Sequence, residues 1–221
     1  MGAKIEFYFL SEANTSDILE YATRTLLEKG WSYNVVIKGQ YTYWLDGPIY
    51  EFGDSKTVIE QSSLGDSSAL SDVVFEVSKH YSPSIYFGIQ WFSRSISAAL
   101  SVIEAADNWK WLLFTFDRFE SLDALPVALK EDAKEQIFNL FTELAQSIKP
   151  FYGIGGTELY VPANRPEELS LQQTIGGDFY YISELAKEKL SVGSHVCNYL
   201  VINNPDNSMI CSKAEELLEL V

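Results

Sequence analysis

The most regular pattern of apolar and polar residues in this chain lies at 127–148. Apolar side chains recur there every three or four positions, which places them on one side of a helix. Pro150 follows, and proline cannot continue a helix. The pattern predicts a long amphipathic helix whose buried stripe consists of Ala133, Ile137, Leu140, Phe141, Leu144 and Ile148.

A second amphipathic helix is predicted near the N-terminus. Asp17 is expected to cap it, and Gly30 is expected to end it. The segments 5–10 and 31–37 flank this helix and are rich in β-forming residues, which predicts two buried strands. The expected buried stripe of the helix is Ile18, Leu19, Ala22 and Leu26.

The middle of the chain alternates apolar segments with turn-forming residues about every ten to twelve positions, which is typical of an antiparallel meander. The predicted strands are 72–81, 84–92, 96–104 and 109–119. Residues 95–105 also fit a helical stripe, and we favour a strand there. Before the meander, the sequence predicts a hairpin or tight bend in 41–54 and a connecting segment in 55–70.

Three further elements are predicted toward the C-terminus. Ser183 is placed to cap a short helix at 184–190, and 197–211 forms a hairpin around the turn residues 204–207. A last helix is expected to begin at the capping box that Ser212 and Glu215 form.

These elements indicate an α+β fold with an antiparallel-rich sheet, or sheets, covered by two main helices. A strand–helix–strand order occurs in each half of the chain; a duplicated unit, with Tyr33 equivalent to Tyr152, is one interpretation of this order. We expect 1–221 to be a single compact domain. The alternative is two intimately packed halves, 1–70 and 71–221.

The charge of the chain restricts its partners. Acidic residues number 31 against 16 Lys and Arg, and the formal net charge is −15. Nucleic acids and anionic membranes attract clustered positive charge, so neither is an expected partner. A basic protein partner fits the charge, and association of the chain with itself is the other possibility.

The N-terminal segment and the cysteines indicate a cytoplasmic protein. The apolar run that precedes Ser11 has only about six residues, which is too short for a signal peptide or a membrane span. The expected hairpin register places Cys211 opposite Leu200 and Cys197 near Ala214, so a cross-strand disulfide is not expected. Both cysteines are therefore expected to be reduced thiols.

The glycine-rich segment PFYGIGGTEL, at 150–159, resembles a phosphate loop only superficially. A phosphate loop leads from a strand into a helix N-terminus, whereas these glycines follow a helix. No Lys-Ser or Lys-Thr pair follows them, and Glu158 would repel a phosphate. We interpret the glycines as positions where a Cβ would not fit against neighbouring chain.

Motifs of zinc, serine-nucleophile and nucleotide chemistry are missing from the sequence, and no metal or cofactor is expected. Asp117, Glu120 and Asp123 cluster at the end of a predicted strand, where paired carboxylates can bind a cation or act as acid and base. Solvated loop charge is the favoured interpretation of this cluster. A catalytic role for the three residues is the alternative.

Aromatic residues are unusually dense at 41–52. If the strands alternate, Tyr41 and Tyr43 share one face and Trp44 lies on the other. Core packing is the simpler explanation, but tyrosine and tryptophan also suit partly wet interfaces. This segment is the candidate binding surface, with Tyr41, Tyr43, Trp44, Tyr50 and Phe52 as its residues.

The sequence does not name a reaction, and whether the chain is an enzyme stays open. We favour a non-enzymatic binding or interaction protein with an acidic surface. The alternative is a small cation-dependent hydrolase that uses the carboxylate cluster.

Overall fold

The computed structural model of this chain describes residues 3–33, 40–44, 55–59, 67–159, 177–190 and 199–213. Eleven strands, four α-helices and one π-helical turn lie in these ranges. In chain order they are β1 (Lys4–Ser11), α1 (Thr15–Glu28), β2 (Ser32–Tyr33), β3 (Gln40–Trp44), β4 (Ser55–Ile59), α2 (Ser67–Val77), β5 (Tyr81–Trp91), β6 (Arg94–Glu104), β7 (Lys110–Asp117), the π-helical turn (Phe119–Asp123), α3 (Val127–Ile148), β8 (Tyr152–Thr157), β9 (Phe179–Ile182), α4 (Glu184–Leu190), β10 (Tyr199–Asn203) and β11 (Met209–Lys213).

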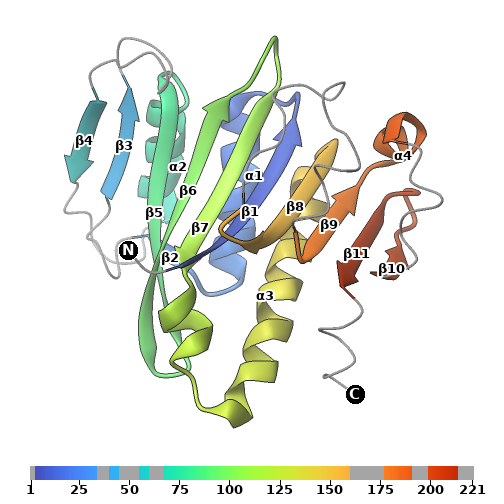
Figure 1. The fold of residues 1–221 in the computed structure, drawn as a ribbon. Coiled ribbons are helices and arrows are strands. Elements are labelled where there is room, and N and C mark those ends of the chain that lie inside the picture. Colours follow the sequence, from blue (N-terminus) through green and yellow to red (C-terminus); the bar gives the residue numbers. More distant parts are fainter. Residues whose placement is uncertain are drawn as a thin grey trace.

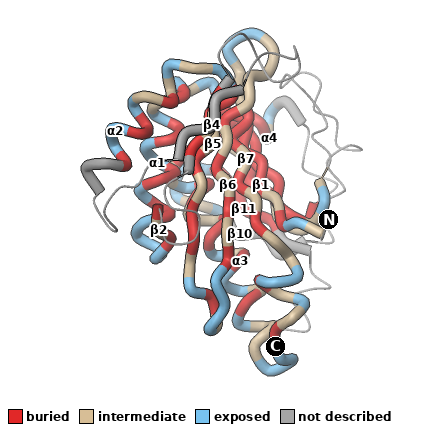
Figure 2. The backbone as a smooth tube through the Cα atoms, turned by 90° about the vertical axis from the view of Figure 1, so that its left-hand side faces the viewer, coloured by how far each residue is buried: buried red, intermediate tan, exposed pale blue. Residues whose placement is uncertain are grey.

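All the strands join one sheet, in the order β10-β11-β9-β8-β1-β7-β6-β5-β3-β4, and β2 pairs with β5 beside this path. Every described strand pair is antiparallel. Helices α1 and α2 lie on one side of the strands, and buried residues occur along the strands and in the helices (Figures 1 and 2). The predicted α+β fold with a helix-covered antiparallel sheet is confirmed.

The two predicted main helices form where the apolar stripes place them. Helix α3 spans Val127–Ile148 and buries the whole predicted stripe; Lys149 then takes a left-handed conformation, with φ of 50°, before Pro150. Helix α1 buries Ile18, Leu19, Ala22 and Leu26, and Gly30, with φ of 84°, follows its end. Asn14 occupies the N-cap position of α1, so the prediction that Asp17 caps this helix is wrong. Asp17 lies instead in the first turn, where a carboxylate is favoured by the helix dipole.

One predicted strand is a helix. Residues 72–81 were expected to begin the meander, yet α2 covers Ser67–Val77. Its buried residues Leu70, Val73, Val74 and Val77 follow helical spacing, because they are three, four and seven positions from the first. The predicted connecting segment 55–70 is likewise wrong, since it contains β4 and the start of α2.

The remaining meander forms as predicted. Residues 95–105 fall almost entirely in β6, and burial alternates along this strand, which confirms a strand over a helix. Strand β3 does belong to a hairpin, but its partner is β4, which begins at Ser55 beyond the predicted 41–54, and Tyr41 lies opposite Val58. The connection of this hairpin, 45–54, lies outside the described residues.

The strand–helix–strand unit occurs twice, as predicted. Helix α1 connects β1 to β2, and α3 connects β7 to β8. The two strands of each unit run parallel to each other, because an even number of antiparallel pairings separates them in the sheet. The residue equivalence is wrong, however. Tyr33 packs in the core cluster on the helix-covered face, whereas Tyr152 packs in a second cluster on the other face.

The main core lies between the sheet and helices α1, α2 and α3. In this core the ring of Phe7, in β1, contacts three other aromatic rings. Its centroid lies 5.4 Å from that of Phe141 in α3, 5.8 Å from that of Phe116 and 6.0 Å from that of Phe114. Edge-on and tilted aromatic pairs of this kind stabilise beyond their buried area. The second cluster lies on the opposite face and includes Tyr8, Trp111, Tyr152, Tyr180 and Cys211.

The glycines of β8 are crowded, as the sequence predicted. A Cβ on Gly153 would lie 2.7 Å from Phe9 Cδ1, and a Cβ on Gly155 would lie within 3.1 Å of Phe7, Phe141 and Phe179. These distances are shorter than ordinary van der Waals contact. Glycine at these positions allows large aromatic rings to approach the strand backbone.

The C-terminal hairpin is β10 and β11. Val201, not the predicted Leu200, lies opposite Cys211, and Cys211 is a free, buried thiol. Ser212 and Lys213 belong to β11, so Ser212 does not cap a helix as predicted. Cys197 lies outside the described residues, and so do residues 214–221, where the last helix is expected. Helix α4 does begin as predicted, because Ser183 Oγ accepts the Ala186 N–H at 3.2 Å.

Candidate functional site

Tyr41 and Tyr43, two residues of the predicted aromatic surface, face the main core. Tyr41 and Tyr43 are 6% and 4% exposed and their rings stack at 6.3 Å in the main core. Trp44 ends β3, and Tyr50 and Phe52 lie outside the described residues. Tyr41 and Tyr43 therefore act in packing, and binding by this segment stays a prediction.

The predicted carboxylate cluster surrounds the π-helical turn. Asp117 Oδ1 accepts the Glu120 N–H at 2.9 Å, and Asp123 Oδ1 lies 3.3 Å from Arg118 Nε. Ser121 Oγ donates to the Asp117 carbonyl at 2.7 Å. Two of the three carboxylates thus hold the local backbone and Arg118 in place.

Metal binding finds no support in this cluster. Within the described ranges, His, Cys, Asp and Glu side chains do not gather in any group of three that could hold a metal ion. A catalytic role for Asp117, Glu120 and Asp123 stays a prediction.

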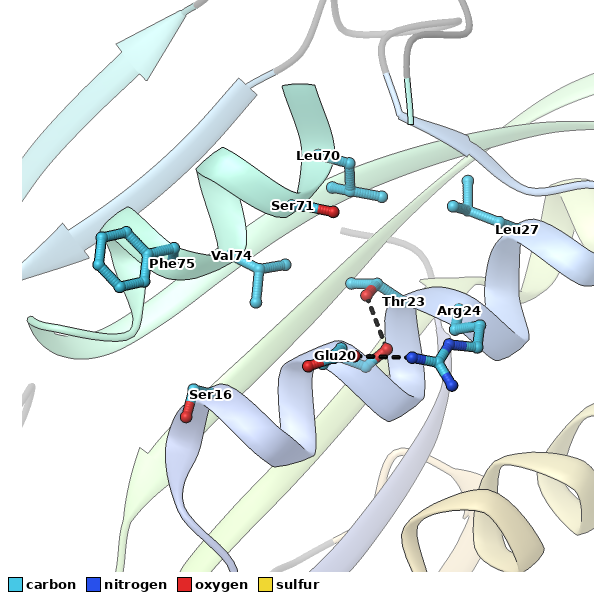
Figure 3. Close-up of a pocket in the computed structure, with 9 residues that line it drawn as sticks. All are labelled: Ser16, Glu20, Thr23, Arg24, Leu27, Leu70, Ser71, Val74 and Phe75. Carbon is cyan, nitrogen blue, oxygen red and sulfur yellow. Dashed lines mark hydrogen bonds and ion pairs between the residues drawn. The ribbon is translucent and has the colours of Figure 1, made fainter. Parts of the chain in front are cut away.

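A groove of about 490 Å³ lies between helices α1 and α2. Both helices lie on the same side of the sheet, and their side chains face each other across the groove (Figure 3). We call it the α1–α2 groove. It is lined by Ser16, Glu20, Thr23, Arg24 and Leu27 of α1 and by Leu70, Ser71, Val74 and Phe75 of α2.

The apolar part of the groove has a buried floor and an exposed rim. Leu70 and Val74 are 4% and 7% exposed, whereas Leu27 is 37% and Phe75 is 66% exposed. Lys79 Nζ lies 4.0 Å from the centroid of the Phe75 ring, in cation–π contact. An aromatic ring this exposed gains free energy if a partner covers it.

The polar side chains of the α1 wall are bonded within their own helix. Arg24 Nη2 lies 2.6 Å from Glu20 Oε1, and Thr23 Oγ1 donates to the Glu20 carbonyl at 3.0 Å (Figure 3). The nine lining residues contain no histidine or cysteine. The groove therefore offers an apolar floor and charged side chains for contact and charge recognition.

Negative charge dominates the two helices that form the groove. Their sequences hold five carboxylates and one cation, Arg24: the carboxylates are Asp17, Glu20, Glu28, Asp72 and Glu76. Hydrogen bonds from Lys79 and His80 lower the pKa of Glu76, which keeps that side chain ionised. The two helices thus carry charge of the same sign as the chain, and Lys79, beside Phe75, pairs with Glu76 at 2.9 Å.

The other side of α1 is closed. Lys29 Nζ lies 2.6 Å from Glu143 Oε1, and Ser147 Oγ donates to the Tyr21 carbonyl at 3.4 Å, so two contacts join α1 to α3. Helix α1 thus packs against α3 and leaves the groove open toward α2.

With 72–81 predicted as a strand, the sequence does not predict this groove. The signal that identifies α2 is present, since Leu70, Val73, Val74 and Val77 follow helical spacing. Phe75 then falls on the outer side of the predicted helix.

Comparison with known proteins adds no assignment. No protein-family model, curated protein or solved structure matches the chain. No helix among the described residues has both the length and the apolar character needed to cross a membrane.

Proposed function

We propose that this chain is a cytoplasmic, non-enzymatic binding protein whose α1–α2 groove receives a basic, amphipathic segment of a partner protein. One observation carries the proposal. The groove joins an apolar floor and an exposed Phe75 to two helices on which carboxylates outnumber cations by five to one.

The apolar side chains of the groove favour a helical segment. Amphipathic helices bind in apolar grooves through side chains spaced three and four residues apart. The floor residues Leu70 and Val74 and the rim residues Leu27 and Phe75 offer contacts to such a row. A volume of about 490 Å³ lies within the range of pockets that bury several ligand groups.

The charge favours a basic partner over a second copy of the chain. Each copy carries a formal net charge of −15, so two copies repel each other at low ionic strength. A segment with Lys or Arg on its polar face would instead pair with exposed carboxylates of the two helices, such as Asp17, Glu28 or Asp72. Such pairs fix orientation and speed up association.

Titration calorimetry with designed peptides tests the proposal. The probe is an amphipathic helix of about 14 residues, or four turns, made of Leu and Lys. A peptide with the same Leu positions and Glu for Lys reverses its charge, and a scrambled Leu and Lys peptide keeps its composition. We expect saturable binding of the first peptide alone, weakened by salt because the charged pairs are partly exposed.

A matched pair of variants locates the binding. Phe75→Ser removes the exposed ring of the groove, and Phe119→Ser removes a similarly exposed ring, at 59%, from the π-helical turn. We expect Phe75→Ser to weaken binding at least about tenfold, because the bound peptide would bury this ring, and Phe119→Ser to leave binding unchanged. Equal affinities in the two variants would contradict the proposal. Dimerisation that Phe75→Ser abolishes would identify a second copy as the occupant and also contradict it.

A further inference from the structure

A second cavity, of about 230 Å³, lies between α3, the π-helical turn and the ends of β1, β8 and β9. Its apolar wall consists of Ile5, Leu122, Ile137, Phe138 and Phe179. The Phe138 and Phe179 rings lie 5.3 Å apart. Arg118, Lys134 and Asp178 are its charged lining residues.

Arg118 is held in a fixed position at this cavity. Its N–H donates to the Ala3 carbonyl at 3.0 Å, Nε donates to Asp123 Oδ1 at 3.3 Å and Nη1 donates to Thr157 Oγ1 at 3.3 Å. A guanidinium has five N–H donors, and these side-chain bonds take two of them. The other donors make no hydrogen bond to residues in the described ranges. A fixed guanidinium with spare donors is suited to bind a carboxylate.

Lys134 brings a second cation to the same cavity from α3. Its Nζ lies 3.2 Å from Glu131 Oε1, and an ammonium has two further donors. Both cations are thus paired at distances longer than the 2.7–2.9 Å of strong charge-assisted hydrogen bonds. Their side chains are only 37% and 29% exposed, so solvent screens them less than it screens open surface charges.

We propose that this cavity binds a small monocarboxylate with an apolar body. The carboxylate would lie at Arg118 and Lys134, and the apolar body would contact Phe138, Ile137 and Leu122. Asp123 and Glu131 already pair with the two cations, and Asp178 also lines the cavity. A ligand with a single carboxylate is therefore favoured over a phosphate or a dicarboxylate, which would bring more negative charge. The volume lies below the 300–1,000 Å³ of pockets for drug-sized ligands, so a nucleotide is too large.

Calorimetric or NMR titration of the full chain with phenylacetate tests this site. Phenylacetamide has the same shape without the charge, and phenethylammonium reverses the charge. We expect saturable binding of phenylacetate, at least about tenfold weaker binding of the amide, because the charge-assisted bonds are lost, and no binding of the cation. Equal binding of acid and amide, or no saturable binding of the acid, would overturn the proposal.

Variants assign the binding to the two cations. We expect Arg118→Gln and Lys134→Gln each to weaken phenylacetate binding at least about tenfold. Arg24→Gln is the matched control, because Arg24 also pairs with a carboxylate but lies at the α1–α2 groove. Lys134→Gln keeps the test decisive if Arg118→Gln, which also loses its bonds to Asp123 and Thr157, fails to fold. Wild-type affinity in a folded Lys134→Gln variant would overturn the assignment.

Discussion

The rings of Tyr43 and His80 stack face to face, with centroids 3.9 Å apart and planes 8° apart. Tyr43 belongs to β3, and His80 follows α2 by three residues. His80 Nε2 also lies 3.5 Å from Glu76 Oε1. The stack therefore joins the outer part of the sheet to the helix that forms one wall of the α1–α2 groove.

Removal of the buried ring should weaken this connection. We expect Tyr43→Ala to lower the free energy of unfolding by about 3–5 kcal/mol, as for other buried aromatic residues. Tyr81→Ala is the control, because Tyr81 is 46% exposed and its loss should change the free energy by about 0.5 kcal/mol or less. Urea denaturation of both variants measures the difference. Similar losses would mean that Tyr43 is not a core residue.

The crowding of β8 predicts a strong effect from one added methyl group. In Gly153→Ala the new Cβ would overlap Phe9, so the ring or the strand must move, and we expect a loss of about 1–3 kcal/mol. Gly30→Ala serves for comparison. No heavy atom lies within 4 Å of its added Cβ, and its positive φ alone should cost about 1 kcal/mol. Chemical denaturation compares them, and a neutral Gly153→Ala would contradict the packing.

Cys211 should be unreactive in the folded chain. The side chain is 2% exposed, and burial raises the pKa of its thiol to about 11, although Lys187 lowers it slightly. Only a small fraction is thiolate near neutral pH, and thiolate is the reactive form. In a Cys197→Ser background, a thiol reagent should therefore react slowly with the folded chain and rapidly in urea. Rapid reaction before unfolding is the opposing result.

The raised pKa of the Glu6 carboxyl should make the stability of the fold depend on pH. Burial is the main cause that raises the pKa of its carboxyl above the ordinary 4.5, and nearby Glu158 adds to it, while the Leu159 N–H and Lys4 act in the other direction. The folded state therefore keeps the proton to higher pH than the unfolded state. Stability falls as the pH rises through the window above 4.5.

Glu6→Gln removes this titration and keeps an oxygen that can accept the Leu159 N–H, now 2.7 Å from Glu6 Oε2. The variant should gain stability relative to wild type as the pH rises from about 4 to about 7. Urea denaturation at several pH values measures this difference. A difference that stays constant or reverses with pH would contradict the raised pKa.

The sequence predicted elements wherever a long periodic stripe decided the structure. Helix α3 is the best case, because its buried residues recur at helical spacing from Ala133 to Ile148 and Pro150 limits its end. The packing role of the β8 glycines was also predictable. These glycines follow a helix, whereas the glycines of a phosphate loop lead into one.

Local β-propensity explains the main error. Val73, Val74 and Phe75 resemble a strand when considered alone, but the sheet buries Val73, Val74 and Val77 on one side of a helix. Tertiary packing thus decided between two patterns that both fit the segment.

Neither cavity could be predicted from the sequence. The α1–α2 groove depends on where two helices lie along the sheet, and the strand order that places them joins segments far apart in the chain. The smaller cavity likewise brings Arg118 to Thr157, which is 39 residues away. Side-chain composition indicates what such residues can bind, but the fold decides which of them meet.

The most direct test of the central claim is a backbone-amide NMR titration of the chain with the Leu and Lys helical peptide. We predict chemical-shift changes concentrated in α1 and α2, at Thr23 and Leu27 on one wall and Val74 and Phe75 on the other. Amides around the π-helical turn should stay unchanged. Changes that avoid both walls of the groove, while the peptide still binds, would contradict the account.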